Sequence, residues 1–203
     1  MQEAKRRAIV EVLIRAAQDS MITHGLDVTV DAVAACAGVN RSTVFRYFST
    51  REELLAAAVR HGARDLEDRL PPLTGGDWRP WLHDICTVIH IRAAETAHGI
   101  WDLTARRDLS PQLSTAATEL RDNRVKRHRS IAHTLWEAAG GAGPLPPEFG
   151  DVVAAHLSPL FTITVLTDLA ADPHAAARLA ETSITTALTQ HTPPHSPSDD
   201  PPT

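Results

Sequence analysis

The sequence has few of the residues and patterns on which enzymes and metal sites depend. Its two cysteines, Cys36 and Cys86, lie far apart and show no metal-ligand spacing with each other. We interpret both cysteines as small apolar core residues of a protein in the reducing cytoplasm. No nucleophile elbow, phosphate-binding loop, HExxH motif or recognisable carboxylate pair occurs. We therefore expect no metal, no cofactor and no enzymatic activity.

A long apolar segment is also lacking. The most apolar stretch, residues 157–169, is interrupted by Ser158, Pro159, three threonines and Asp168. It is too short and too polar to cross a bilayer. No charged segment followed by an apolar one marks a signal peptide at the start. These features predict a cytoplasmic protein that does not enter a membrane.

Acidic and basic residues are unevenly distributed along the chain, although the net charge is only −5. Residues 1–64 contain nine Lys or Arg and seven Asp or Glu, which gives a local charge of +2. The remaining residues contain eleven Lys or Arg and eighteen Asp or Glu, which gives −7. The mildly acidic average therefore does not exclude a nucleic-acid-binding region at the N-terminal end.

Apolar spacing and capping residues predict an all-α protein that contains a helix-turn-helix motif. Thr29 is placed to cap one short helix, and Gly38 to end it, because glycine adopts the left-handed conformation at little cost. Asn40 is placed to cap a second short helix, which presents polar and cationic side chains outward. Its two phenylalanines, Phe45 and Phe48, are expected to pack into the core. A short helix held at a fixed angle by a packed partner is suited to the major groove of DNA.

Further helices precede and follow this motif. Thr50 and Glu53 form a capping box for a helix that runs to about Leu70, and the breaker Pro-Pro-Leu-Thr-Gly-Gly follows at 71–76. Pro159 is expected to kink a later helix or to delay its start. The last twelve residues contain five prolines and are predicted to be disordered. Helical spacing covers residues 5–23, 78–98, 100–107, 110–139, 147–171 and 174–190.

Four linked pieces carry a resemblance to a known family. They are Thr29-Val-Asp-Ala-Val-Ala, Ala37-Gly38-Val39, Thr43-Val-Phe-Arg-Tyr47-Phe48 and Arg51-Glu-Glu-Leu-Leu55. In this order and near the N-terminus, they resemble the DNA-binding domain of the TetR family of transcriptional repressors, over about residues 5–58. The resemblance implies an N-terminal three-helix helix-turn-helix domain. It also implies a C-terminal helical domain that binds an effector between its middle helices and dimerises through its last two.

The expected organisation follows from the resemblance and the breaker. It comprises a DNA-binding domain over residues 1–50, a connecting helix and linker over 51–76, an effector-binding and dimerisation domain over 77–191, and a disordered Pro-rich tail over 192–203.

The outer face of the second motif helix supplies the candidate DNA contacts. Arginine pairs with guanine in a bidentate manner, and a threonine methyl packs against thymine, so Arg46 and Thr43 are candidate base contacts. The resemblance assigns phosphate contacts to Tyr47 and Arg51. The alternative for the two arginines is an ordinary solvated face. The full set of candidates is Thr29, Asn40, Arg41, Ser42, Thr43, Arg46, Tyr47 and Arg51.

The last two helical segments are apolar or small on nearly every face, as expected for helices that are covered on both sides. We expect a twofold homodimer through residues 150–190, and the alternative is a fully internal helix pair. The candidate interface residues are Val153, Leu157, Leu160, Thr164, Leu179, Ser183 and Ala187.

The effector pocket is predicted from the placement of aromatic residues. All four tryptophans lie after residue 77, in a chain with only 4% aromatic residues. An apolar cleft with a few polar anchors suits a mostly hydrophobic effector, although ordinary core packing is the alternative for each tryptophan. The candidate lining residues are Trp81, Ile85, Ile89, Arg92, Trp101, Trp136, His156 and Phe161.

The leading hypothesis is a sequence-specific DNA-binding transcriptional regulator, a repressor released from a palindromic operator by a small, largely hydrophobic effector. Its expected partners are double-stranded operator DNA, the effector and a second copy of the chain. The alternatives are an architectural DNA-binding protein without an effector and an enzyme with an appended DNA-binding end. The basic run 121–129 is interpreted as a solvated helix face, with a second nucleic-acid patch as the alternative.

Overall fold

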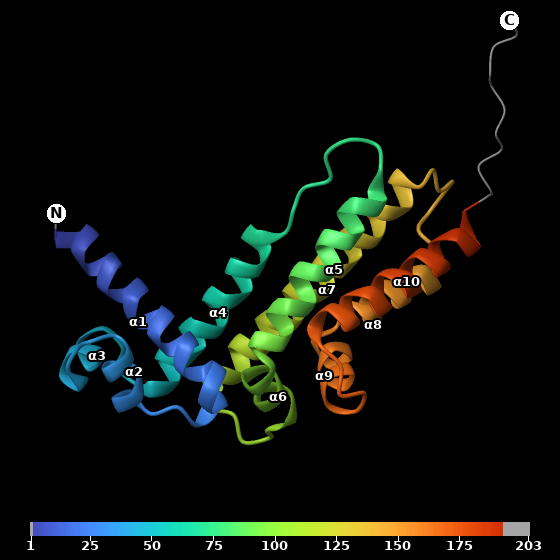
Figure 1. Cartoon of the computed structure of the whole chain (residues 1–203). Coiled ribbons are helices and arrows are strands. Elements are labelled where there is room, and N and C mark those ends of the chain that lie inside the picture. The colour runs from blue at the N-terminus through green and yellow to red at the C-terminus, as the bar shows by residue number, and fades with distance from the viewer. Residues whose placement is uncertain (1, 193–203) are drawn as a thin grey trace, which may run out of the picture.

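A computed structural model describes residues 2–192, and within them the chain is helical with no strand. The all-α prediction is therefore confirmed. The helices are α1 (Gln2–His24), η1 (Gly25–Asp27), α2 (Val30–Cys36), α3 (Arg41–Tyr47), α4 (Arg51–Arg69), α5 (Trp78–Glu95), α6 (Ala97–Ala105), α7 (Pro111–Ala138), α8 (Pro147–His156), α9 (Pro159–Thr167) and α10 (Pro173–His191) (Figure 1). The predicted tail, apart from Thr192, lies outside the described residues.

Side-chain caps fix most of the predicted helix starts. Thr29 accepts a hydrogen bond from Ala32 N at 3.1 Å at the start of α2. At the start of α4, Thr50 Oγ1 accepts from Glu53 N at 3.1 Å, while Glu53 accepts from Ser49 N at 2.8 Å. These bonds satisfy amide donors that have no partner within the helix. The predicted capping box is thus confirmed, with its glutamate bonded one residue earlier than the usual pattern.

Proline divides the predicted helix over residues 147–171 into two. Pro159 cannot donate an amide hydrogen bond and occupies the first turn of α9, where none is needed. Ser158 caps α9 through Leu160 N at 3.2 Å, and α8 and α9 meet at a bend of 51°. The predicted effect of Pro159 is therefore confirmed as a break rather than a gentle kink.

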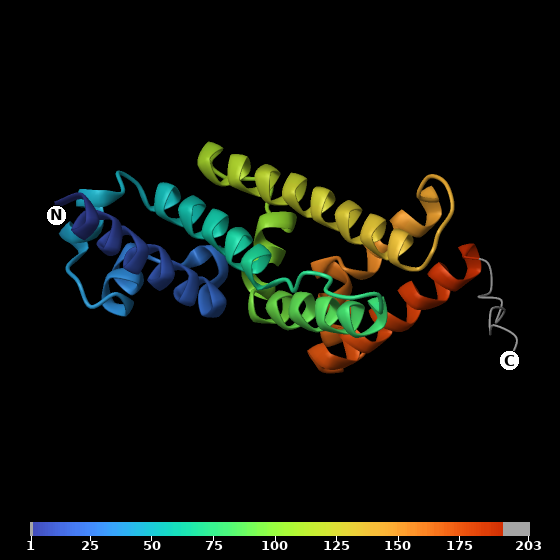
Figure 2. The ribbon, with the colours of Figure 1, turned by 90° about the horizontal axis from the view of Figure 1, so that it is seen from above.

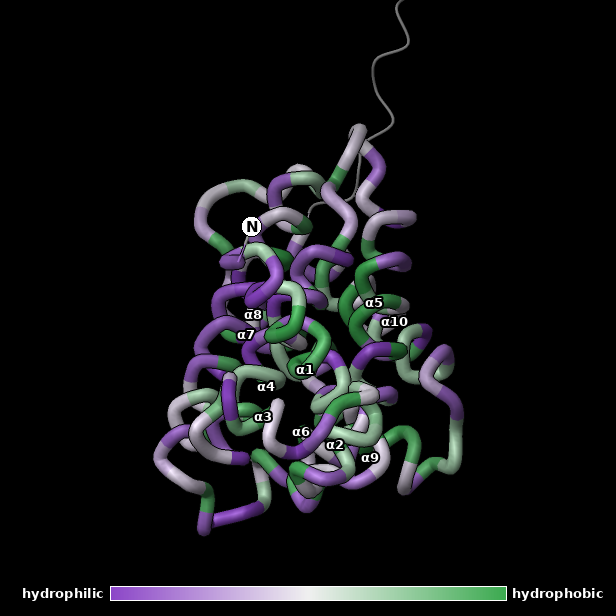
Figure 3. Tube along the Cα trace, turned by 90° about the vertical axis from the view of Figure 1, so that its left-hand side faces the viewer, coloured by the Kyte–Doolittle hydropathy of each residue, from purple (hydrophilic) through white to green (hydrophobic). Residues whose placement is uncertain are grey.

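The described chain forms an elongated bundle with two apolar cores (Figure 2). The first core joins α1–α4 to Leu103 of α6 and to Leu113 and Ala116 of α7. The second core joins α5, α8, α10 and the C-terminal half of α7. Hydrophobic turns of α5 lie near α10 in the hydropathy-coloured trace (Figure 3). Helix α7 contributes to both cores, so it ties the two ends of the molecule together.

Two residues expected in the core are not there. Cys36 is exposed at the end of α2, whereas Cys86 is fully buried as predicted. Phe45 is 42% exposed, whereas Phe48 is buried. In α2 the buried residues are Val30, Val33 and Ala34, and in α3 the buried residue is Val44, so Cys36 and Phe45 lie on the faces turned away from the first core.

Candidate DNA-binding helix and internal pocket

The turn between α2 and α3 is built around one left-handed residue. Gly38 has φ of +66°, a conformation in which other L-residues are strained. Its amide donates to Ala35 O at 3.1 Å, and the next amide, of Val39, donates to Ala34 O at 2.9 Å. These bonds end α2 and direct the chain into α3. Val44 and Phe48 then anchor α3 in the first core.

The opposite face of α3 is exposed and cationic. Arg41, Ser42, Phe45 and Arg46 are exposed, and Tyr47 is half-buried. The Arg41 guanidinium lies 5.3 Å from the Phe45 ring centroid, and the Arg46 guanidinium lies 5.1 Å from the Tyr47 ring centroid. Stacking on an aromatic face reduces the freedom of each arginine. The face presents two ordered cations and an aromatic side chain, which matches the residues that contact bases and phosphates.

The remaining candidates on the motif surround this face. Asn40 is the residue before α3, but its side chain makes no capping hydrogen bond, which corrects the predicted cap. It is exposed and free to bond elsewhere. Thr43 is half-buried, and the Thr29 hydroxyl is occupied by its cap. The structure therefore places Asn40, Arg41, Ser42 and Arg46 at the surface, as it does Thr29, whereas Thr43 is less accessible.

A surface ion pair lies at the edge of the face. Arg41 Nη1 lies 2.6 Å from Asp31 Oδ2, and both side chains are more than half exposed. Exposed pairs of this kind contribute little stability, on the order of 0–1 kcal/mol. The pair is therefore easily exchanged for a contact between Arg41 and a phosphate.

Arg51 is placed differently from the phosphate contact that the resemblance implies. Its Nε donates to Val28 O at 2.6 Å, its Nη2 donates to Leu26 O, and its Nη1 bonds Glu52 at 3.0 Å. The guanidinium thus closes the segment between η1 and α2 onto the start of α4. In this structure Arg51 positions the motif, and each of its three nitrogens already makes one hydrogen bond.

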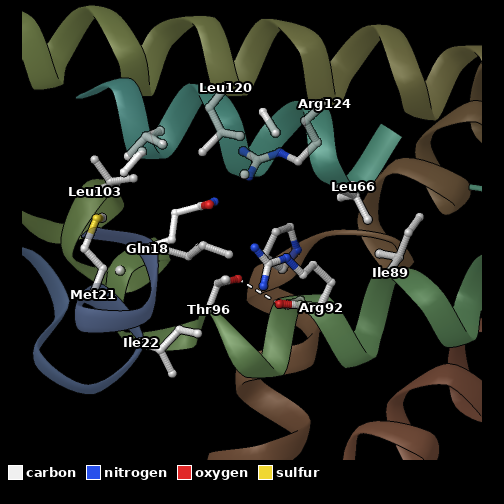
Figure 4. A pocket seen from close by; sticks show the side chains of 18 of the residues that line it. Gln18, Met21, Ile22, Leu66, Ile89, Arg92, Thr96, Leu103, Leu120 and Arg124 are labelled. Atoms are coloured by element: carbon white, nitrogen blue, oxygen red, sulfur yellow. Dashed lines mark hydrogen bonds between the residues drawn. The ribbon is translucent and has the colours of Figure 1, made fainter. Parts of the chain in front are cut away.

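An internal pocket lies between the two cores, with a cavity volume of about 120 Å³. Helices α1, α4, α5, α6 and α7 and the α8–α9 junction enclose it (Figure 4). Its lining is mainly apolar, with arginines from α5 and α7 (Figure 4). The lining residues are Gln18, Met21, Ile22, Ala58, Val59, Gly62, Ala63, Leu66, Ile89, Arg92, Ala93, Thr96, Gly99, Ile100, Leu103, Leu120, Arg124, Arg127, Leu157 and Pro159.

Only Ile89 and Arg92 of the predicted pocket residues line this cavity. The tryptophans do not: Trp101 is 55% exposed, and Trp136 packs in the second core, where its Nε1 donates to Gly143 O at 3.2 Å. Trp81 Nε1 donates to Pro71 O at 2.7 Å. Trp81, together with Ile85, lines a separate hollow beside Glu67 and Lys126.

The other three predicted pocket residues also lie outside the cavity. Ile85 is buried in the second core, and Phe161 stacks against His156, with ring centroids 5.1 Å apart, and against His90, at 5.8 Å. His90 Nδ1 lies 2.7 Å from Thr162 Oγ1. Burial lowers the pKa of His90 to about 4, and the neighbouring His156 adds to this. His90 is therefore neutral at pH 7 and serves as a packed polar link between α5 and α9.

The sequence interpretation missed two arginines. Arg124 and Arg127 belong to the run that was interpreted as a solvated face, yet both are half-buried and line the cavity. Arg121, Lys126 and Arg129 of the same run are exposed as expected. No local pattern sets these two apart, because exposed Arg121 lies three residues before Arg124 and shares its face of the helix.

Helix α6 joins the pocket to the DNA-binding end. Asp102 Oδ2 accepts from Leu26 N at 2.7 Å, and Arg106 bridges Asp27 at 2.7 Å and Asp102 at 3.4 Å. The hydrogen bond with Arg106 lowers the pKa of Asp27. Gly25 faces the same carboxylate and has room for no side chain. The helix that lines the pocket is thus bonded directly to the segment between α1 and α2.

The predicted dimer residues divide into two groups. Val153 and Leu157 are fully buried inside this chain, so they are corrected to core residues. Leu157 follows α8 at the bend before α9 and lines the pocket. Leu160 and Leu179 are 43% and 44% exposed, Thr164 is exposed, and Ser183 and Ala187 are half-buried.

Within residues 2–192, no single helix is both long and apolar enough to cross a membrane, and only the bent pair α8–α9 meets the criteria of length and composition. The same residues contain no group of three or more His, Cys, Asp or Glu side chains that could hold a metal ion.

Comparison with known proteins defines the class of the molecule. Residues 13–58 match the family described as "Bacterial regulatory proteins, tetR family". No curated protein matches the sequence. With this match on the α1–α4 segment, the class is a helix-turn-helix DNA-binding transcriptional regulator. The match over residues 13–58 confirms the resemblance to the TetR family that the sequence predicts for this segment.

Solved structures share the fold over most of the chain. A transcriptional regulator from Rhodococcus sp. Rha1 aligns with a TM-score of 0.69 and 22% identity, covering 89% of this chain and 96% of that chain. A TetR-family regulator from Streptomyces coelicolor aligns with a TM-score of 0.66 and 19% identity, covering 89% of this chain and 79% of that chain. The regulator FadR from Bacillus subtilis, solved with stearoyl-CoA, aligns with a TM-score of 0.60 and 16% identity, covering 88% of this chain and 97% of that chain. The C-terminal fold is thus shared where sequence similarity is low.

Proposed function

We propose that the protein is a repressor that binds a palindromic operator as a twofold dimer and leaves it when an effector occupies the pocket. In this proposal residues 1–50 bind DNA, residues 51–76 connect, and residues 77–191 bind the effector and dimerise. The observation that carries it is the position of the pocket, which is lined by helices of the DNA-binding core and of the C-terminal core together. A ligand there contacts both parts at once.

Operator reading is assigned to the exposed face of α3. Arg46 and Arg41 supply bidentate donors, Ser42 and Asn40 supply short polar groups, and Tyr47 lies beside Arg46. Phe45 is added to this face, because an exposed phenyl ring packs on thymine methyl groups. Arg51 is assigned a positioning role through its bonds to the carbonyls before α2.

Dimerisation is assigned to the outer faces of α9 and α10, through Leu160, Thr164, Leu179, Ser183 and Ala187. The hydroxyl groups of Thr182 and Thr186 on α10 donate to carbonyls of their own helix at 2.8 Å. They therefore carry no unsatisfied donor into an interface. A twofold axis here places two α3 helices at a fixed spacing, and reading adjacent major grooves requires about 34 Å or somewhat more.

Release from DNA follows from the joint between α6 and η1. An effector that fits better when α6 and α4 are shifted favours a dimer with altered α3 spacing. Asp102, bonded to Leu26 N, carries the shift of α6 to the segment before α2. The effect on DNA affinity cannot exceed the difference in effector affinity between the two arrangements.

The test of DNA reading begins with selection of binding sites from random DNA, followed by polarisation titrations with the selected duplex. We expect a palindromic site and a loss of about tenfold to a hundredfold in affinity for Arg46→Ala, as for a lost base contact of ~1–3 kcal/mol. Arg129→Ala, an exposed arginine of α7, is the matched control and should leave affinity unchanged. Sequence-independent binding that is insensitive to Arg46→Ala would overturn the proposal.

The test of the dimer is sedimentation of the full chain. Leu179→Glu places a charge on the proposed interface and should shift the protein to monomer, since a buried unpaired charge is costly. Val125→Glu, at a side chain 52% exposed on α7, is the matched control and should remain dimeric. A Leu179→Glu dimer as stable as the original protein contradicts the assigned interface.

A further inference from the structure

We infer that the pocket binds an amphipathic carboxylate, a molecule with an apolar body and one anionic head group. The inference deepens the proposed function and rests on it in one respect, namely that the pocket is the effector site. It is carried by the charge and the shape of the pocket.

The charged lining of the pocket is of one sign only. Arg92, Arg124 and Arg127 line it, and none of its lining residues is acidic. In Figure 4, Arg124 from α7 and Arg92 from α5 enter the pocket from opposite sides. Arginine remains charged at any physiological pH, so the positive charge cannot be removed by loss of a proton. Three guanidinium groups around one cavity therefore favour an anion.

Two of these arginines make no ion pair in the part of the chain that the structure describes. Arg92 bonds Glu95 at 3.1 Å, and its Nε lies 3.9 Å from Asp65, whereas Arg124 and Arg127 make no ion pair. The Nε of Arg127 is buried without a hydrogen-bond partner. A buried guanidinium without partners is costly, and a bound carboxylate that accepts its hydrogen bonds removes that cost.

The surroundings of the two arginines agree with this reading. Burial lowers the pKa of Arg124, and so does the charge of Arg121. Burial also lowers the pKa of Arg127; Glu67, beside it, acts in the opposite direction, and Arg124 adds to the lowering. Arg127 also lines a second hollow on the side of Glu67. Arg124 therefore has the least compensated charge and is the main anchor for the head group.

The rest of the pocket suits a hydrocarbon body. Met21, Ile22, Leu66, Leu103 and Leu120 surround the cavity (Figure 4). Its volume, about 120 Å³, is close to that of an engineered cavity of roughly 150 Å³ that binds benzene. A body of about that size or a short chain fits without polar partners. The head group then meets the guanidinium groups, which fixes the direction of the molecule.

The experiment compares three probes of equal chain length: octanoate, octan-1-ol and octylammonium. Binding to the full chain is measured by titration calorimetry in the absence of DNA. We expect octanoate to bind at least about tenfold more tightly than octan-1-ol, as for a charge-assisted hydrogen bond, and octylammonium not to bind. Equal binding of octanoate and octan-1-ol, preference for octylammonium, or no binding of octanoate overturns the inference.

Variants locate the head group. Arg124→Gln and Arg127→Gln should each weaken octanoate binding by about tenfold and leave octan-1-ol binding unchanged, because only the anion uses these donors. Arg121→Gln is the matched control, since Arg121 is exposed on the same helix and does not line the pocket. A thermal melt of each variant confirms that it is folded. Octanoate affinity that is unchanged in both pocket variants overturns the assignment.

A DNA titration separates this inference from the proposed function. Octanoate that binds through Arg124 and Arg127 but does not alter operator affinity supports the inference about the pocket and contradicts effector-driven release. If octan-1-ol releases DNA as effectively as octanoate does, the switch is supported and the requirement for an anionic head group is contradicted.

Discussion

Gly25 and Asp102 provide a sharp test of the joint between the DNA-binding end and α6. Gly25 has φ of +56°, and a Cβ there would lie 2.3 Å from Asp102 Oδ2. The substitution Gly25→Ala therefore has two costs. The left-handed conformation costs roughly 1–2 kcal/mol for a residue with a Cβ. Displacement of the carboxylate also leaves the amide of Leu26, a residue only 2% exposed, without its acceptor, which costs about 1–3 kcal/mol.

A double-mutant cycle separates these two costs. Asp102→Ala removes the carboxylate and destabilises the protein by about 1–3 kcal/mol, because the Leu26 amide loses its acceptor. In that background Gly25→Ala meets no carboxylate, so it should cost only the conformational part. The two substitutions together should then destabilise the protein by less than the sum of the single effects, by about 1–3 kcal/mol.

The measurement is urea denaturation of the full chain for the original protein, the two single variants and the double variant. Gly75→Ala is the control for conformational strain alone, since Gly75 has φ of +89° and open space around its Cβ position. If Gly25→Ala costs the same with and without Asp102, the close approach does not hold in solution and the proposed link between α6 and η1 is refuted.

Three further predictions concern the pocket, the buried histidines and the recognition helix. A Cβ on Gly62 of α4 would lie 2.9 Å from Gln18 Nε2 and 3.7 Å from Arg92 Nη2. Gly62→Ala should therefore narrow the pocket and weaken octanoate binding in calorimetry. It should also stabilise the fold by about 0.5–1 kcal/mol in urea, because alanine favours the helix over glycine. His90 should make stability fall between pH 6.5 and 4, on the order of 2–3 kcal/mol, because the unfolded histidine binds a proton below about 6.5 that the folded one excludes until about 4. His90→Gln should reduce the fall of the urea midpoints across this range without abolishing it, because burial also lowers the pKa of His128 to about 4; an unaltered slope would contradict the burial argument. Phe45→Ala should weaken operator binding in polarisation titrations with no loss of stability, since the ring is 42% exposed. If the variant instead loses stability and keeps its DNA affinity, Phe45 packs in the core and does not contact DNA.

Sequence patterns predicted the helices well because their signals are local. Thr50, Glu53 and Gly38 act on amides and dihedral angles within a few residues of their own positions, and each does so in the structure. Pro159 broke its helix for the same reason, since it lacks the amide hydrogen. The motif of α2 and α3 is a combination of such local signals, and it is the part that the family match covers.

The pocket could not be predicted in the same way because its walls come from segments far apart in the chain. Arg124 has no local feature that distinguishes it from exposed Arg121. Its burial depends on how α7 lies against α4, which is decided by the packing of many side chains. The tryptophans illustrate the opposite error: Trp136 is conspicuous in the sequence, but local packing in the second core accounts for it.

The sequence by itself determined that this protein is helical, that residues 29–48 form a helix-turn-helix, and that a longer helical region follows. Caps, glycine and proline act locally, so short patterns are sufficient to predict them. Only the tertiary structure decided which arginines face the pocket, that Val153 and Leu157 lie in the core, and that Arg51 bonds the carbonyls before α2. Those properties depend on distances between residues remote in sequence, and only the packed chain sets such distances.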